Sequence, residues 1–337
     1  MDNDSSQRRP SLKFFSLLRS LGFSLSFALS LFLVGQSVLA QTNPTRPIRI
    51  VVPLPAGTAT DMAARMLGQQ LSILFNQPFV VDNKPGANGT IGVMDLLRSP
   101  PDGHTLLIGS NSPLATNFAL LKVMPYDPRR DFTPIVGFGE TMHVLMVRPN
   151  FPAKNLAEFV AYVKQRPGKI SAGVTTSSTE VQIATLNQLS GMDLLPVPYK
   201  GIPATITDVM GGTLDVTLVD LANAMAQAKG GNLRPLAVTS MKRNALVPDW
   251  PSIAETFPGY DFPSWVGLVG PAGMAKAMVD RINVATAQVL KQPAMAEKLA
   301  TMGMTPMPMQ PDQFKTFIDA ELVKWVRLAK DANVQPQ

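Results

Sequence analysis

Cysteine is absent from the 337-residue chain, and there are only two histidines, His104 and His143. The absence of cysteine excludes disulfide bonds, which an oxidising compartment permits but does not require. Charged residues make up only 16% of the sequence and form no long run of one sign. Nucleic-acid binding needs a clustered basic face, often with stacking aromatics, so we expect no nucleic-acid partner. The length suggests about two globular domains.

Long apolar runs are also missing, except near the N-terminus. Basic residues between positions 8 and 19 precede a stretch at 21–34 that is almost entirely apolar or small. Val38-Leu39-Ala40 then supplies small residues for cleavage, so the order predicts a signal peptide at 1–40 and a mature chain that begins at Gln41. An uncleaved anchor is the alternative, but the run is short for a membrane span.

The export route has two interpretations. The segment RRPSLK at 8–13 resembles a twin-arginine signal, with Ser11 in place of the usual aromatic residue. We favour an ordinary basic region of the general secretion route. The lack of cysteine near the cleavage site excludes a lipoprotein, and we therefore expect a periplasmic protein.

Short β-rich runs alternate with helical patterns after Gln41. The order β-α-β-α-β in the first part indicates a parallel, doubly wound sheet and an α/β fold. The predicted strands are 48–52, 79–81, 105–108, 144–147, 170–173, 194–199, 215–219, 236–239 and 265–269. The predicted helices are 62–75, 91–98, 155–165, 179–189, 204–210, 222–229, 275–291, 294–302 and 313–330.

Signatures of catalysis are missing. The sequence has no GxSxG elbow, no P-loop and no HExxH motif. The histidines have no flanking ligand pattern, and we expect structural roles for both, with His104 in a turn that enters a strand. The segment GANG at 86–89 lacks the GxGxxG spacing and is expected to form a tight turn before the helix at 91–98.

Two further interpretations stay open. An enzyme with a cryptic α/β site would need an oriented base or nucleophile, and Asp61, Asp220 and Lys200 form no recognisable set. We therefore expect no enzyme activity and no cofactor. A methionine cluster at 302, 304, 307 and 309 is able to hold soft copper(I) in principle. We favour core packing for these side chains and predict no metal site.

Polar or glycine-bearing loops follow four of the predicted strands. In open α/β sheets, ligands bind at the carboxyl ends of the strands. Free N–H groups at helix N-termini together with Ser and Thr hydroxyls suit an anion, although single residues such as Thr60, Asp61 and Ser177 equally suit helix caps. The candidate ligand-binding residues are Pro55, Ala56, Gly57, Thr58, Thr60, Asp61, Ser110, Asn111, Thr175, Thr176, Ser177, Ser178 and Asp220.

Several segments, taken in order, resemble the substrate-binding receptors of tripartite tricarboxylate transporters, known as the Bug family. The resemblance covers essentially all of residues 44–330. The segments are RPIRIVVP at 46–53 followed by Gly57 and Asp61, QPFVVDNKPGA at 77–87, PDGHTLL at 101–107, PYDP at 125–128, DF at 131–132, VPYKG at 197–201, LAVTS at 236–240 and SWVGL at 264–268.

The resemblance implies a type II periplasmic-binding-protein architecture: two doubly wound α/β domains with a ligand cleft between them. The crossovers fall near 144 and 265, which places domain 1 at 41–143 plus 266–337 and domain 2 at 144–265. The implied ligand is a di- or tricarboxylate, an amino acid or an aromatic acid. One carboxylate would be held by amides of the first loop, and the Ser/Thr loop of domain 2 would face it. The implied partner is a membrane permease, or alternatively a sensor protein, and we expect a monomer.

The sequence departs from the family pattern in three loops. Thr58 stands where the first loop usually has a second glycine. The loop at 174–176 is shorter by about two residues, and Glu180 stands where a histidine is common. Asp220 lies one position later than the usual acidic residue. A carboxylate at this point is able to accept a hydrogen bond from a ligand ammonium group.

Overall fold

The computed structural model describes residues 46–336, so the predicted signal peptide lies outside the described residues. Thr45–Gln337 form one compact unit. No helix in the described range is long and apolar enough to cross a membrane.

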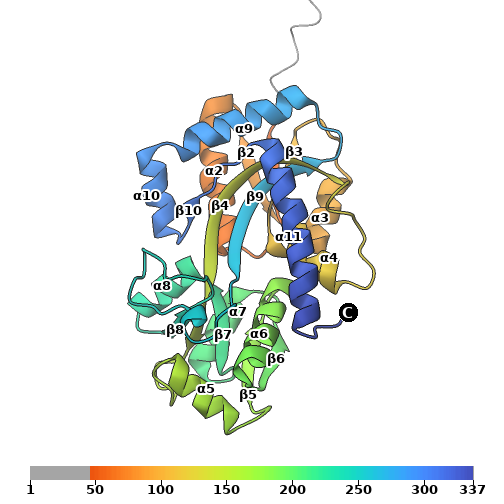
Figure 1. Cartoon of the computed structure of the whole chain (residues 1–337). Coiled ribbons are helices and arrows are strands. Elements are labelled where there is room, and N and C mark those ends of the chain that lie inside the picture. Colours follow the sequence, from red (N-terminus) through yellow and green to blue (C-terminus); the bar gives the residue numbers. More distant parts are fainter. Residues whose placement is uncertain (1–45, 337) are drawn as a thin grey trace, which may run out of the picture. The chain divides into compact units, whose positions relative to one another are not determined.

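The unit is built on a ten-stranded sheet (Figure 1). The main path through the sheet is β2-β1-β3-β9-β4-β7-β5-β6, and β8 and β10 both pair with β4. The strands are β1 (Ile48–Val52), β2 (Phe79–Asn83), β3 (Thr105–Ser110), β4 (Phe132–Val147), β5 (Ile170–Val174), β6 (Leu194–Pro198), β7 (Val216–Asp220), β8 (Arg234–Val238), β9 (Pro263–Pro271) and β10 (Thr305–Pro306).

The first long helix begins and ends at residues that favour helix termini. Thr58 caps the first long helix by accepting from the Asp61 N–H, and Asn76 ends it in the left-handed conformation at φ 51°. The helices are α2 (Ala59–Phe75), α3 (Thr90–Leu97), α4 (Asn117–Leu120), α5 (Leu156–Lys164), α6 (Ser177–Ser190), α7 (Ile202–Gly211), α8 (Leu221–Lys229), α9 (Lys276–Leu290), α10 (Pro293–Thr301) and α11 (Pro311–Asp331), with short turns η2 (Ala87–Gly89), η3 (Ser112–Thr116) and η4 (Ile253–Glu255).

The predicted parallel sheet is confirmed for the first part of the chain, but two long strands later in the chain are antiparallel. The pairs β1–β2, β1–β3, β5–β6 and β5–β7 are parallel, but β4 and β9 run antiparallel to their neighbours. The strand predicted at 144–147 is only the end of β4, which begins at Phe132. Pro134, Gly137 and Gly139 interrupt its apolar pattern, and the register with β9 shifts at these points.

The two long strands connect the two halves of the sheet. β4 pairs with β9 through residues 132–142 and with β7 and β8 through residues 143–147. In Figure 1 they run side by side from the upper half, which contains β1–β3, to the lower half, which contains β5–β8. His143 is therefore the residue at which the partners of β4 change.

Two smaller predictions also needed correction. The helix predicted at 62–75 begins at Ala59, because Thr58 supplies the cap. Residues 112–120, for which no element was predicted, form η3 and α4. The expected tight turn before α3 is confirmed, with Gly86 and Gly89 at φ 122° and 86°, values that favour glycine.

The core contains one buried polar junction that ties α11 to β9. The Glu321 carboxylate accepts from the indole N–H groups of Trp265 at 2.8 Å and Trp325 at 3.0 Å, and all three side chains are buried. The methionines at 302–309 divide between two hydrophobic clusters, with Met302 and Met304 in one and Met307 and Met309 in the other. This distribution agrees with the predicted core packing.

Candidate functional site

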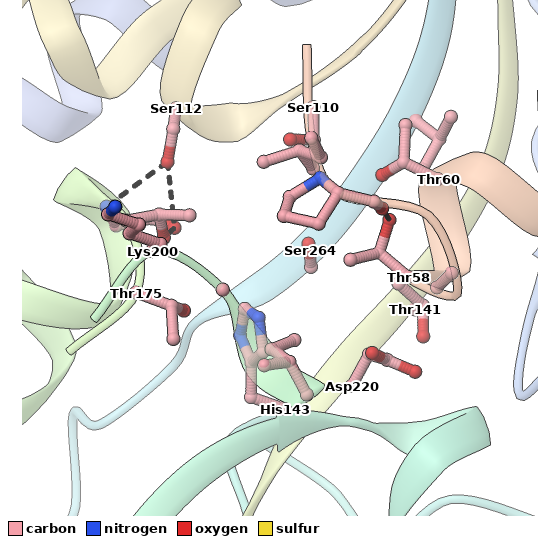
Figure 2. A pocket seen from close by; sticks show the side chains of 18 residues that line it. Thr58, Thr60, Ser110, Ser112, Thr141, His143, Thr175, Lys200, Asp220 and Ser264 are labelled. Carbon is pink, nitrogen blue, oxygen red and sulfur yellow. Dashed lines mark hydrogen bonds between the residues drawn. The ribbon is translucent and has the colours of Figure 1, made fainter. Parts of the chain in front are cut away.

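A small cavity lies where strands from both halves of the sheet end. Figure 2 shows hydroxyl groups from several loops facing this space. The cavity volume is about 50 Å³, and a water molecule needs about 10–15 Å³ on this measure. The cavity therefore holds a few waters or one small polar group. It is lined by Leu54, Pro55, Thr58, Ala59, Thr60, Ser110, Ser112, Thr141, His143, Thr175, Thr176, Ser178, Lys200, Gly201, Ile202, Asp220, Ser264 and Val266.

Most of the predicted site residues come together in this cavity. Those that line it are Pro55, Thr58, Thr60, Ser110, Thr175, Thr176, Ser178 and Asp220. The predicted residues that do not line it are Ala56, Gly57, Asp61, Asn111 and Ser177. Ligand binding by any of the thirteen predicted residues stays a prediction. Their contacts in the fold explain why eight line the cavity and five do not.

The Asp61 side chain holds the loop before α2 in place through hydrogen bonds. Its carboxylate accepts from the Gly57 N–H at 2.9 Å, the Asn83 amide at 2.9 Å and Arg65 at 3.2 Å. Burial raises the pKa of Asp61, but the hydrogen bonds from Arg65, Gly57 and Asn83 outweigh burial, so the pKa lies below its usual value. The Gly57 amide, a predicted anion donor, is thus already occupied by a carboxylate of the chain itself.

Hydroxyl groups satisfy the N-terminus of α6. Thr176 is the N-cap and forms a reciprocal capping box with Thr179. The Ser177 hydroxyl donates to Asn117 Oδ1 at 2.7 Å and so faces away from the cavity. The Ser178 hydroxyl lies 3.2 Å from the Ser112 hydroxyl, which also accepts from the Ser178 N–H at 3.3 Å.

Asn111 acts as a link between strands. Its amide donates to the Pro263 carbonyl at 3.2 Å, and its Oδ1 accepts from the Ser264 hydroxyl and the Trp265 N–H. These contacts hold the end of β3 against the start of β9. They also turn the Asn111 side chain from the cavity, whereas Ser110 and Ser264 line it.

Asp220 is the one carboxylate among the described residues that line the cavity. It ends β7, caps α8 and is only 4% exposed. Its oxygens accept from the Asn223 N–H at 3.0 Å and the Asn223 side-chain amide at 2.8 Å. Burial raises the pKa of Asp220, and hydrogen bonds from Asn223 and the backbone of Ala59 only partly oppose this shift.

Two nitrogen-bearing side chains that line the cavity, His143 and Lys200, were not among the predicted ligand-binding residues. His143 was expected to be structural, whereas its imidazole lines the space beside Asp220 in Figure 2. Its Nδ1 lies 3.2 Å from the Gln182 amide nitrogen. Burial lowers the pKa of His143 to about 4, so the ring is neutral at pH 7. No motif marks His143, because its position depends on long-range strand register.

The arrangement does not form a hydrolytic triad. A triad histidine needs a hydroxyl nucleophile on one ring nitrogen and a carboxylate on the other. Within residues 46–336, no hydroxyl is hydrogen-bonded to the His143 ring, and its Nδ1 faces an amide. Besides the Asp220 carboxylate and the His143 ring, the cavity offers hydroxyls and one ammonium group, which suit the binding of an anion. His104, as expected, lies in the turn before β3.

Comparison with known proteins connects the chain to one family. The model of the tripartite tricarboxylate transporter family receptor matches residues 63–334. Protein BugT of Bordetella pertussis is 31% identical over 306 residues, which are 90% of this chain and 94% of BugT.

Two solved structures with bound acids are also similar. R. palustris Rpa4515 with adipate has a TM-score of 0.85 and 32% identity, over 87% of this chain and 99% of that one. MatC (Rpa3494) from Rhodopseudomonas palustris with bound malate has a TM-score of 0.80 and 28% identity, over 85% of this chain and 99% of that one.

Proposed function

The chain belongs to the family of tripartite tricarboxylate transporter receptors, and on this premise we propose that it captures a small carboxylate outside the cytoplasm for a membrane permease. The observation that carries the proposal is the cavity at the strand ends, where hydroxyls surround the space and Lys200 is the one cation among the lining residues. The relatives with bound adipate and malate support a carboxylate as the ligand. A protein that senses the same solute for a signalling partner is the second candidate.

The ligand's charge is the direct test of this proposal. Isothermal calorimetry should detect binding of at least one acid from a panel of di- and tricarboxylates, amino acids and aromatic acids. The neutral amide or methyl ester of that acid should bind more weakly by about 1.5 kcal/mol or more, the contribution of one charge-assisted hydrogen bond. Equal affinity for the acid and its amide contradicts the carboxylate assignment.

We propose that the ligand is bound between two domains, 41–143 plus 266–337 and 144–265, that close around it. Supporting this division, β4 and β9 are the described strands through which the two halves of the sheet are joined. Closure by bending of these strands would bring the loops of β1 and β5 together around the ligand. Small-angle scattering should then show a smaller radius of gyration with ligand than without it.

Export and the absence of turnover complete the proposal. Cleavage after Ala40 should leave a periplasmic monomer that begins at or near Gln41, and mass spectrometry of the exported protein checks this. A protein that retains residues 1–40 contradicts the cleavage. The ligand should be recovered unchanged after long incubation, because the His143 ring lacks the partners of a catalytic base. Appearance of a product would instead support an enzyme.

A further inference from the structure

The cavity floor carries a histidine and an aspartate side by side. His143 of β4 and Asp220 of β7 are register partners in an antiparallel pair. Side chains at such positions leave the same face of the sheet with Cβ atoms about 4.5–5.5 Å apart. Both residues are at least nine-tenths buried, and both line the cavity. Figure 2 shows the imidazole beside Asp220 and pointing into the space below Ser264.

The hydrogen bond on the far side of the ring fixes what His143 offers to the cavity. In the orientation that the structure gives the Gln182 amide, its nitrogen lies 3.2 Å from Nδ1 and donates to it. A neutral imidazole then carries its proton on Nε2, and burial keeps the ring neutral by lowering its pKa to about 4. Within the described residues, Nε2 has no hydrogen-bond partner. His143 therefore presents an unpaired N–H donor beside the acceptor oxygens of Asp220.

The two charged residues of the lining give the cavity a polarity. Lys200 is the one cation and Asp220 the one carboxylate among the lining residues. A ligand carboxylate is favoured near Lys200 and the hydroxyls of the α6 loop, and is repelled by the Asp220 carboxylate. Lys200 also lines a neighbouring cavity of about 630 Å³ that shares Leu54, Pro55, Thr175 and Thr176 with the first. The second cavity has room for the rest of a longer ligand.

We propose that His143 donates from Nε2 to an oxygen of the ligand while Asp220 accepts from a neighbouring hydroxyl or ammonium group. The pair then selects acids that carry a hydroxyl or ammonium group on the carbon next to a carboxylate. This inference rests on the proposed carboxylate-binding function.

Matched four-carbon diacids test the selection. Succinate, malate and aspartate differ only in hydrogen, hydroxyl or ammonium at the second carbon. Calorimetry on the mature protein should show malate or aspartate binding at least about tenfold more tightly than succinate, the effect of one hydrogen bond to a charged group. Succinate binding as tightly as both overturns the inference but leaves the proposed function intact. Failure of every acid in the wider panel contradicts the proposed function itself.

Two substitutions of His143 separate ligand contact from folding. The amide of glutamine reaches the position of Nε2, whereas the amide of asparagine reaches only that of Nδ1. His143→Asn should keep a partner for Gln182 but weaken the preferred acid about tenfold, and His143→Gln should stay within about threefold of the parent. The reverse order, or no loss in either variant, overturns the contact.

Asp220→Asn tests the second half of the pair and does not depend on the His143 variants. Asparagine caps helices about as well as aspartate, so α8 should be retained, which circular dichroism checks. Removal of the negative charge should strengthen succinate and weaken aspartate, so that the preference for the substituted acid falls about tenfold. An unchanged preference excludes Asp220 from the selection.

Discussion

The N-termini of α2 and α6 face the same cavity but are stabilised differently. At α2, Thr58 supplies a hydroxyl cap, but the loop before it is also held by a buried carboxylate of the chain itself, because Asp61 accepts from Gly57 and Arg65. At α6, the capping groups are hydroxyls, with Thr176 and Thr179 in a reciprocal box and Ser178 against Ser112. At both ends a threonine, Thr58 or Thr176, accepts from a backbone N–H that a helix leaves unpaired.

The difference shows which end is better able to exchange its partners for a ligand. Hydroxyls donate and accept, so they are able to turn toward an incoming carboxylate with little change in charge. The Asp61 carboxylate only accepts and already places a negative charge at the N-terminus of α2. We infer that the α2 loop gives the cavity its shape, and that the α6 loop gives it adaptable donors.

The largest expected effect is on stability, from Asp61→Ala. The substitution leaves the donors of Gly57 and Asn83 without their acceptor and should lower the free energy of unfolding by about 3 kcal/mol in urea titrations. Asp61→Asn retains one acceptor oxygen and should cost less. A change below about 1 kcal/mol for Asp61→Ala contradicts the organising role of this side chain.

Acid should affect the two ends in different pH windows. The pKa of His143, which contacts α6 through Gln182, falls from 6.5 in the unfolded chain to about 4 in the folded protein. The unfolded state therefore takes up the proton first, and stability is lost as the pH falls from 6.5 to 4, by about 3 kcal/mol in the limit. For Asp61, whose pKa is lowered from 3.8, stability is present above that pH and is lost below it.

Urea unfolding of the parent and His143→Gln at pH 7.5 and 4.5 checks the first window. The variant should lose less stability than the parent over this interval. Asp220 acts in the opposite direction, because its raised pKa makes its buried charge least favourable at neutral pH. The difference between the two proteins, rather than either curve alone, therefore isolates His143. Parallel curves contradict the neutral, buried imidazole.

Adjacent residues of α6 should separate ligand affinity from stability. Thr176 lines the cavity, whereas Ser177 is bonded to Asn117 outside it. Thr176→Ala should weaken the ligand several-fold and cost about 1 kcal/mol of stability through the lost cap. Ser177→Ala should cost a similar amount of stability through its hydrogen bond but leave affinity near that of the parent. Calorimetry and thermal unfolding distinguish the two results, and a larger affinity loss in Ser177→Ala reverses the assignment.

The hydrophobic pattern of the sequence predicted the short strands and the polar loops that follow them. The strand at 48–52 and the polar loops after strands β1, β5 and β7 follow from apolar runs that end in Gly, Thr, Ser or Asp. The long strand β4 was hidden because Pro134 and two glycines break its alternation. Its central residues consequently had no predicted position in the sheet.

The missing site residues depend on pairings that are distant in the sequence. Thr141 and His143 enter the cavity through the register of β4 with β9 and β7, and Ser264 enters through β9. Ser112 meets Ser178, which lies 66 residues away. The sequence also does not show which of the polar residues at a helix N-terminus line the cavity, which is why Ser177 and Asp61 were predicted beside Thr176 and Thr58. Only the tertiary contacts separate them.

The smallest expected effect concerns a contact between the α2 loop and α8. The Asn223 amide donates to the Gly57 carbonyl at 3.2 Å and to Asp220 at 2.8 Å. Asn223→Ala removes both side-chain hydrogen bonds but keeps the bond from the backbone N–H of residue 223 to Asp220. The free energy of unfolding should therefore fall by only about 0.5–1.5 kcal/mol. Because Gly57 and Asn223 lie in the two proposed domains, the variant should also favour the open arrangement, which small-angle scattering without ligand detects as a larger radius of gyration.

Gln227→Ala on the same helix is the control. The Gln227 side chain accepts from the exposed Asn232, so its loss should leave the radius of gyration unchanged. If Asn223→Ala and the parent have equal radii of gyration, this contact does not hold the domains together. Closure then rests on the cavity lining that the two domains share.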